Sequence, residues 1–184
     1  LEPERFVLLE GQVTDHALRA GREVQQAVAT AGARWELTAS HADEESRLAA
    51  RILVDPAQAP WNQGYRLSIG PEGIRIVAHD AAGAFYAAMT LKQIARQFAG
   101  RGELPCVLVL DWPDFPNRGV MLDICKYKVP TMETLYGLVD MLAEWKVNQL
   151  QLYAEHTFAY RSFPEVSHGF SPVTGEEVLA LDAY

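Results

Sequence analysis

The sequence predicts an α/β protein in two parts, and three observations lead to this fold class. Over roughly the first 110 residues, strand-like apolar stretches alternate with two helical stretches and include a hairpin. This mixture is typical of an α+β domain with helices on one face of a mixed sheet. A stretch rich in proline and aromatic residues follows at 111–119 (DWPDFPNRG). After it, a strand, a helix and a strand occupy about 36 residues, the length of a βαβ unit from a barrel or a doubly wound sheet.

The helices of the first part are marked by residues that suit helix ends. Thr14 or Asp15 can cap a helix that stops at Gly32, and Asp80 can cap a second helix that stops at Gly100. The first domain is expected to cover residues 1–112. Its strands are expected over 5–10, 35–39, 51–54, 65–69, 73–78 and 105–110, with the fourth and fifth forming a hairpin around Gly70-Pro71-Glu72.

The second part, residues 113–184, begins with a nearly continuous apolar strand at 119–124 (GVMLDI). That composition predicts a parallel strand covered on both faces. Pro130 and Thr131 open a helix with one apolar side, and the second strand is expected over 148–153 (NQLQLY).

A last helix is expected near the end of the chain, where Thr174 and Glu177 match a capping box. Two strands cannot close a barrel, so we expect a truncated one. Exposed barrel edges would then favour self-association, because unpaired strand edges and apolar faces pair with other chains.

Composition excludes some function classes and leaves others open. The formal net charge of −8 disfavours a nucleic-acid partner, since binding phosphates requires a basic face. No apolar run approaches the ~20 residues that span a bilayer, so no membrane partner is expected. The two cysteines, Cys106 and Cys125, are expected to be buried free thiols. The compartment stays open.

Two stretches resemble one enzyme family. Residues 81–94 (AAGAFYAAMTLKQI) are similar to the pattern that ends the non-catalytic α/β domain of family 20 glycoside hydrolases, the β-N-acetylhexosaminidases. Residues 115–153 resemble the first βαβ unit of that family's (β/α)8 catalytic barrel, with its Arg-Gly-x-x-Leu-Asp and Lys-x-Asn-x-Leu motifs. The resemblance therefore implies that residues 113–184 are the N-terminal portion of a TIM barrel. The segment 154–160 (AEHTFAY) departs from the family's His-Leu-Thr-Asp-Asp pattern and suggests a divergent branch.

The resemblance also implies a reaction: retaining hydrolysis of terminal β-linked N-acetylhexosamine, with the substrate's own acetamido oxygen as nucleophile and no metal or organic cofactor. The family uses an Asp-Glu pair on its fourth barrel strand. The chain's Asp-Glu dipeptide, Asp43-Glu44, lies in the polar stretch HADEES and is interpreted as a charged surface loop. We therefore expect no catalytic residues in this chain, and we expect residues 1–184 alone to be inactive.

The candidate substrate-binding residues come from the barrel-like part. The resemblance assigns Arg118 to the hydroxyls of the terminal sugar, and the alternative is an arginine that pairs with a carboxylate to hold the domain junction. Asp123, charged in an apolar strand, is expected to support Arg118. Glu155 and His156 follow the second strand, where (β/α)8 enzymes place their active sites. We expect this pair either to contact the substrate, by binding or proton transfer, or to brace the barrel rim. His156 and His168 form no metal-binding pattern.

Other functions fit the same sequence. One alternative is a non-catalytic carbohydrate-binding or interaction module. Another is part of a different TIM-barrel hydrolase, for which the 154–160 segment is the best argument.

Overall fold

The computed structural model describes residues 1, 5–11, 14–39, 48–126 and 128–184. They form two compact units, Leu1–Pro116 and Asn117–Tyr184. The division lies four residues beyond the domain boundary at residue 112 that the sequence suggests, and both fall within the proline-rich connector.

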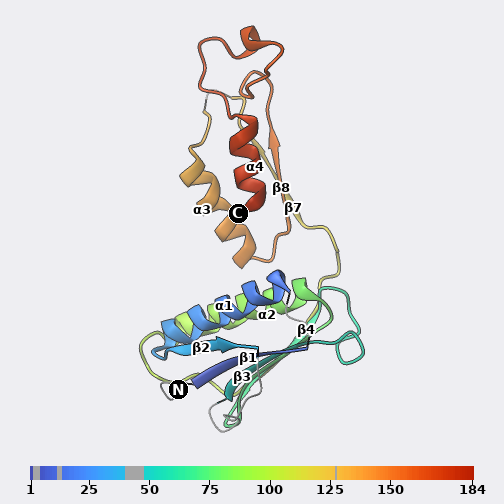
Figure 1. The fold of residues 1–184 in the computed structure, drawn as a ribbon, viewed down its shortest axis with the longest axis vertical. Coiled ribbons are helices and arrows are strands. Elements are labelled where there is room, and N and C mark those ends of the chain that lie inside the picture. The colour runs from blue at the N-terminus through green and yellow to red at the C-terminus, as the bar shows by residue number, and fades with distance from the viewer. Residues whose placement is uncertain (2–4, 12–13, 40–47, 127) are drawn as a thin grey trace. The chain divides into compact units, whose positions relative to one another are not determined.

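The first unit contains a six-stranded mixed sheet (Figure 1). The strand order is β2-β1-β3-β5-β4-β6; β2, β1, β3 and β5 run parallel, and β4 runs antiparallel to both β5 and β6. The strands are β1 (Arg5–Glu10), β2 (Trp35–Thr38), β3 (Leu48–Val54), β4 (Tyr65–Gly70), β5 (Gly73–Ala78) and β6 (Val107–Asp111). The expected hairpin is the β4–β5 pair, with Gly70 opposite Gly73.

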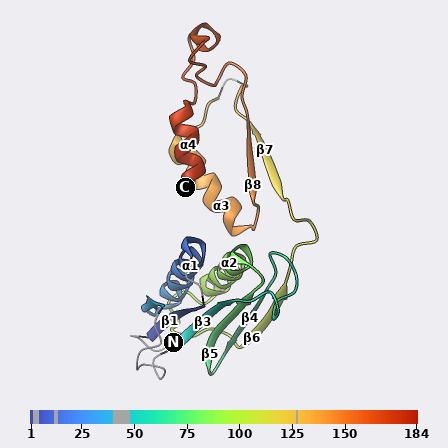
Figure 2. The ribbon, with the colours of Figure 1, turned by 45° about the vertical axis from the view of Figure 1, so that its right-hand side comes forward.

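Both helices of this unit, α1 (Asp15–Ala31) and α2 (Ala81–Gln97), lie on the same face of the sheet (Figures 1 and 2). Thr14 caps α1 through its side chain, and Asp80 caps α2 by accepting a hydrogen bond from Gly83 N–H at 2.8 Å. Alternate strand residues point toward the helices, and many of them are buried in the core between the sheet and the helices. In β4 these are Tyr65, Leu67 and Ile69.

A close contact explains one residue of the 81–94 motif. Gly83 lies in the first turn of α2, and a Cβ there would sit 2.3 Å from the carbonyl oxygen of Gly64. That carbonyl accepts a hydrogen bond from His79 N–H at 3.0 Å, so it cannot move freely. Glycine is therefore required for α2 to begin this close to the loop before β4.

The start of the connector packs against the first unit. Trp112 stacks on Trp61 with ring centroids 4.3 Å apart and an interplanar angle of 12°. The Gln63 side chain donates to the carbonyl oxygen of Pro116 at 3.0 Å. These contacts hold the connector residues up to Pro116 against the loop that precedes β4.

The second unit is built on two parallel strands, β7 (Gly119–Asp123) and β8 (Gln149–Tyr153), joined through helix α3 (Met132–Glu144). A 3-10 turn (Pro164–Ser167) and helix α4 (Gly175–Ala183) follow. The predicted capping box of Thr174 and Glu177 is present. These elements bear out a mixed α/β fold.

Two expectations about burial are wrong. Val120 and Met121 of β7, which point to opposite faces of the sheet, are 39% and 60% exposed, so the described residues do not cover the strand on both faces. Cys106 is exposed just before β6, whereas Cys125 is buried just after β7, so only one thiol is shielded. The Asp43-Glu44 dipeptide lies outside the described residues. None of the described helices is long and apolar enough to span a membrane.

Candidate active-site face at the strand ends of the second unit

The register of β7 and β8 brings two sets of polar side chains to one end of the strands. Asp123, the last residue of β7, lies opposite Tyr153, the last residue of β8. The pairing continues one residue further, since Ile124 N–H donates to the Tyr153 carbonyl at 3.0 Å. Lys126 follows β7 and Glu155 follows β8. The carboxyl ends of parallel strands are where (β/α)8 enzymes place catalytic and binding groups.

Asp123 is committed to the turn that follows its own strand. Its Oδ1 accepts hydrogen bonds from both the amide and the thiol of Cys125, each at 2.9 Å. The thiol bond, followed by the amide bond, lowers the pKa of Asp123, so the carboxylate stays charged. The same bond to Asp123, together with burial, raises the pKa of the Cys125 thiol and makes it a poor nucleophile at neutral pH.

Tyr153 and Glu155 form a second bonded pair on the same rim. The Tyr153 hydroxyl donates to Glu155 Oε1 at 2.9 Å, which raises the pKa of the phenol. Both side chains are exposed, so the carboxylate retains acceptor positions that point to solvent. The pair presents a charged acceptor beside an aromatic ring, two groups that sugars commonly contact.

Lys126 supplies the positive charge of this rim. The Cys125 thiolate, which forms only at alkaline pH, raises the pKa of the Lys126 ammonium most, followed by the Glu155 and Asp123 carboxylates. The ammonium therefore stays protonated and donates hydrogen bonds at physiological pH. The face thus combines a donor, an acceptor and an aromatic ring within reach of a small polar ligand.

His156 has different surroundings from Glu155. Its ring packs on Phe170 at a centroid distance of 4.2 Å. Within the described part of the chain, its Nε2 atom and the Oγ1 atom of Thr157 are buried without a hydrogen-bond partner. The backbone next to His156 is joined to the segment before α4, because Val173 N–H donates a hydrogen bond to the Thr157 carbonyl at 2.8 Å. His156 thus packs within its own loop, which supports the bracing interpretation over substrate contact.

Arg118 lies at the other end of β7 from this rim. Its Nε donates to the Lys146 carbonyl oxygen at 2.8 Å, and its amide donates to Asn148 Oδ1 at the same distance. The five residues of β7 separate Arg118 from the rim by roughly 16 Å, because a strand rises about 3.3 Å per residue. The structure therefore does not bring Arg118 together with Glu155 and His156.

The expected support of Arg118 by Asp123 is replaced by other contacts. Asp123 binds Cys125 at the rim, while Arg118 ties the start of β7 to the turn between α3 and β8. This arrangement supports a structural interpretation of Arg118. The aromatic residues Phe158 and Tyr160 pack edge to face at 5.1 Å, as loop packing would predict.

From the sequence, Tyr153, Phe158 and Tyr160 are expected either to stack on a sugar ring or to pack within the loop. Lys126 is not among the residues that the sequence predicts, although it follows a predicted barrel strand, the position that identified Glu155. Among the described residues, no group of three or more His, Cys, Asp or Glu side chains is placed to hold a metal ion.

Comparison with known proteins decides the family. Residues 9–112 match the model of glycosyl hydrolase family 20, domain 2. The chain belongs to glycoside hydrolase family 20. The resemblance drawn from the sequence motifs is thereby confirmed.

The relatives of this family 20 chain are much longer proteins. A β-hexosaminidase of Akkermansia muciniphila is 35% identical over 98 residues, which are 53% of this chain and 20% of the relative. A β-hexosaminidase of Vibrio furnissii is 29% identical over 153 residues, covering 80% of this chain and 24% of the relative. The chain therefore spans about a quarter or less of these curated relatives.

A solved structure shares the fold over nearly the whole chain. The Streptomyces plicatus β-hexosaminidase D313A variant, in complex with the product GlcNAc, superposes with a TM-score of 0.77 at 24% identity. The superposition covers 97% of this chain and 39% of that one.

Proposed function

We propose that this chain is the N-terminal part of a β-N-acetylhexosaminidase that hydrolyses terminal β-linked N-acetylhexosamine. The observation that carries the proposal is the family 20 match over residues 9–112, followed by a parallel β7–β8 pair with polar groups at its carboxyl end. The β-hexosaminidases of Akkermansia muciniphila and Vibrio furnissii give the substrate class. In this proposal, β7, α3 and β8 are the first βαβ unit of a (β/α)8 barrel.

The proposed binding face consists of Lys126, Tyr153 and Glu155. The Lys126 ammonium donates to a sugar hydroxyl, and the Glu155 carboxylate accepts from another. The Tyr153 bond to Glu155 fixes the direction of that carboxylate before substrate arrives, which lowers the entropy cost of binding. Asp123 positions the turn that carries Lys126, because its carboxylate holds the Cys125 amide and thiol.

Proton transfer is proposed to come from outside residues 1–184. The reaction needs a general acid for the leaving group and a carboxylate that orients the acetamido oxygen for attack at the anomeric carbon. Among the described residues of the rim there is no such pair of free acids, since Asp123 is bound to Cys125 and Glu155 is bound to Tyr153. The rim residues therefore bind the sugar, and the acidic pair of the remaining barrel performs the chemistry.

The test compares this chain with the longer protein that the proposal requires. The longer protein is expected to hydrolyse 4-nitrophenyl N-acetyl-β-glucosaminide and to release the β-anomer first, as seen by proton NMR of the anomeric signals. Residues 1–184 are expected to show no turnover. Hydrolysis by residues 1–184, or none by the longer protein, would refute the proposal.

A further inference from the structure

The first unit carries a cationic patch on the sheet face opposite α1 and α2. Register places Arg51, Arg75, Ser68 and Leu108 side by side across β3, β5, β4 and β6. Arg66 lies two residues from Ser68 along β4, on the same face. Arg66 and Arg75 are therefore diagonal neighbours, a spacing at which long side chains interact.

The charges of this patch are not balanced. Arg51 pairs with Glu10 at 3.0 Å. Arg66 and Arg75 are exposed, and in the described part of the chain neither forms an ion pair. Two like charges within reach of each other repel, and an anion bound between them would offset that repulsion. The chain as a whole has a net charge of −8, so this local excess of positive charge runs against its overall composition.

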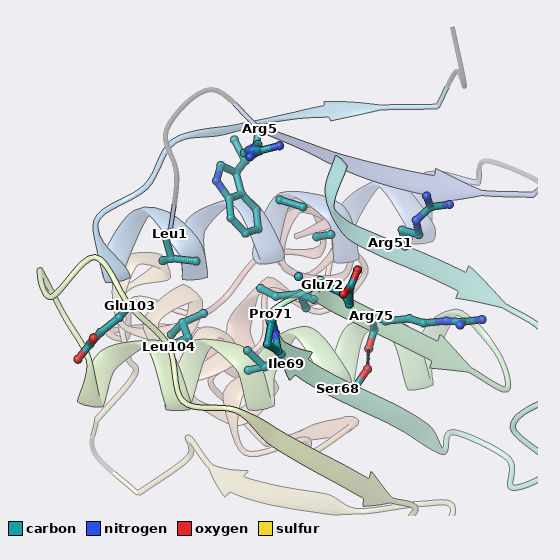
Figure 3. Close-up of a pocket in the computed structure, with 16 residues that line it drawn as sticks. Leu1, Arg5, Arg51, Ser68, Ile69, Pro71, Glu72, Arg75, Glu103 and Leu104 are labelled. Carbon is teal, nitrogen blue, oxygen red and sulfur yellow. Dashed lines mark hydrogen bonds between the residues drawn. The ribbon is translucent and has the colours of Figure 1, made fainter. Parts of the chain in front are cut away.

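The patch is hollowed to the size of a small molecule. A cavity of about 310 Å³ is lined by Gln58, Arg66, Ser68, Arg75, Val77 and Leu108. This volume lies at the lower end of the range for ligand pockets, about 300–1,000 Å³. Ser68 and Arg75 also border a larger hollow at the end of the sheet, of about 940 Å³, where the Arg75 side chain extends away from its strand (Figure 3).

The chemistry of the lining selects an anion with an apolar side. Each guanidinium offers five N–H donors in a planar fork that matches a carboxylate or a sulfate. Val77 forms part of the apolar lining, and Leu108, which is 67% exposed, forms the rim on β6. A sugar ring has an apolar C–H face that suits such a surface.

We propose that Arg66 and Arg75 bind a sulfate or carboxylate group carried on a sugar, with the sugar ring against Val77 and Leu108. The site lies wholly within the first unit and uses none of the strand-end residues of the second unit. It does not depend on hydrolysis, so its test is separate from that of the proposed function.

The test titrates residues 1–184 with four probes: N-acetylglucosamine 6-sulfate, glucuronic acid, neutral N-acetylglucosamine and inorganic sulfate. The Nε–H signals of Arg66 and Arg75 are followed by ¹⁵N NMR. One or both acidic sugars are expected to shift both signals saturably, and to bind more tightly than inorganic sulfate or the neutral sugar. The paired substitution Arg66→Gln and Arg75→Gln is expected to weaken binding at least about tenfold, because charge-assisted hydrogen bonds are lost.

Two further variants make the result specific. Arg22→Gln removes the same charge from an exposed position on α1 and is expected to leave the affinity unchanged. If the glutamine pair does not fold, Arg66→Lys with Arg75→Lys keeps the charge and removes the fork, and an affinity loss of about tenfold is still expected. The proposal is overturned if no acidic sugar saturates, if the Arg22 variant loses as much affinity, or if inorganic sulfate binds more tightly than the acidic sugars.

Discussion

The hydroxyl of Tyr153 donates a 2.9 Å hydrogen bond to the carboxylate of Glu155, two residues further along the chain. The bond crosses the point where β8 ends, so the strand fixes the direction of a carboxylate that would otherwise rotate in solvent. A strand end with one oriented acceptor is a better sugar-binding element than a free loop glutamate.

Tyr153→Phe is expected to raise KM for an N-acetylhexosaminide about three- to tenfold in the longer protein, because Glu155 loses its fixed direction. Steady-state kinetics measure this change. Tyr160→Phe, at another exposed tyrosine of the following loop, serves as the control and is expected to leave KM as it is. Equal effects of the two substitutions would argue against a role for the Tyr153 bond.

Arg118→Ala is expected to lower the stability of the second unit by about 1–2 kcal/mol, because the donor to the Lys146 carbonyl is lost. Chemical denaturation of residues 1–184, with a spectroscopic signal from the second unit as the readout, measures this change in the free energy of unfolding. In the longer protein, the remaining folded enzyme is expected to keep its KM. A large rise in KM at unchanged stability would instead favour the sugar-binding role that the family resemblance implied.

Gly83→Ala and Gly137→Ala are expected to act in opposite directions, although both glycines lie in helices. At Gly83 the new methyl group meets the Gly64 carbonyl at 2.3 Å, so a loss of about 1–3 kcal/mol is expected. At Gly137 the same group meets nothing within 4 Å, so alanine should stabilise α3 by about 1 kcal/mol. Urea unfolding of the two variants measures both changes, and losses of equal size would disprove the steric explanation.

Stability should fall as the pH rises above about 10, partly because of Tyr65. Burial raises the pKa of this phenol, whose hydroxyl is bonded to Thr90 Oγ1 at 2.6 Å and to Asp111 Oδ2 at 2.8 Å. The unfolded chain ionises Tyr65 near pH 10 while the folded chain keeps the proton. The stabilisation that the Tyr65 proton contributes is therefore complete below about pH 10, and it is lost as the pH rises from there toward the higher pKa of the folded chain.

Tyr65→Phe tests this assignment. The variant should be less stable than the parent at pH 8, since two hydrogen bonds are lost, yet it should lose less stability between pH 8 and pH 10.5. Urea midpoints at the two pH values give the comparison. A steeper alkaline loss in the variant than in the parent would contradict the assignment.

Local signals in the sequence predicted much of the secondary structure. The caps at Thr14, Asp80, Thr131 and Thr174 were readable because a capping side chain binds an amide three residues away. The strand order of the first unit was not readable. It places β3 between β1 and β5 through pairings that join residues far apart in the chain, such as Leu9 with Ile52.

The candidate site was predicted in part for a similar reason. Glu155 is predicted from its position after a strand, whereas Lys126, which follows β7, is not among the predicted residues. Arg118 was predicted to bind sugar together with Glu155 because motif similarity aligns residues along the sequence. In the structure, Arg118 precedes β7 and Glu155 follows β8, so the two residues lie at opposite ends of the parallel pair. The hydrogen bond from the Cys125 thiol to Asp123 depends on the conformation of the turn after β7, which the sequence pattern does not predict.

The most direct test of the central claim is the kcat/KM of Lys126→Met for 4-nitrophenyl N-acetyl-β-glucosaminide in the longer protein. Lys128→Met removes the same charge from an exposed position two residues away and is the matched control. If the ends of β7 and β8 form the sugar-binding face, Lys126→Met should lower kcat/KM at least about tenfold while Lys128→Met leaves it within about twofold. An unchanged kcat/KM in a correctly folded Lys126→Met protein would contradict the account.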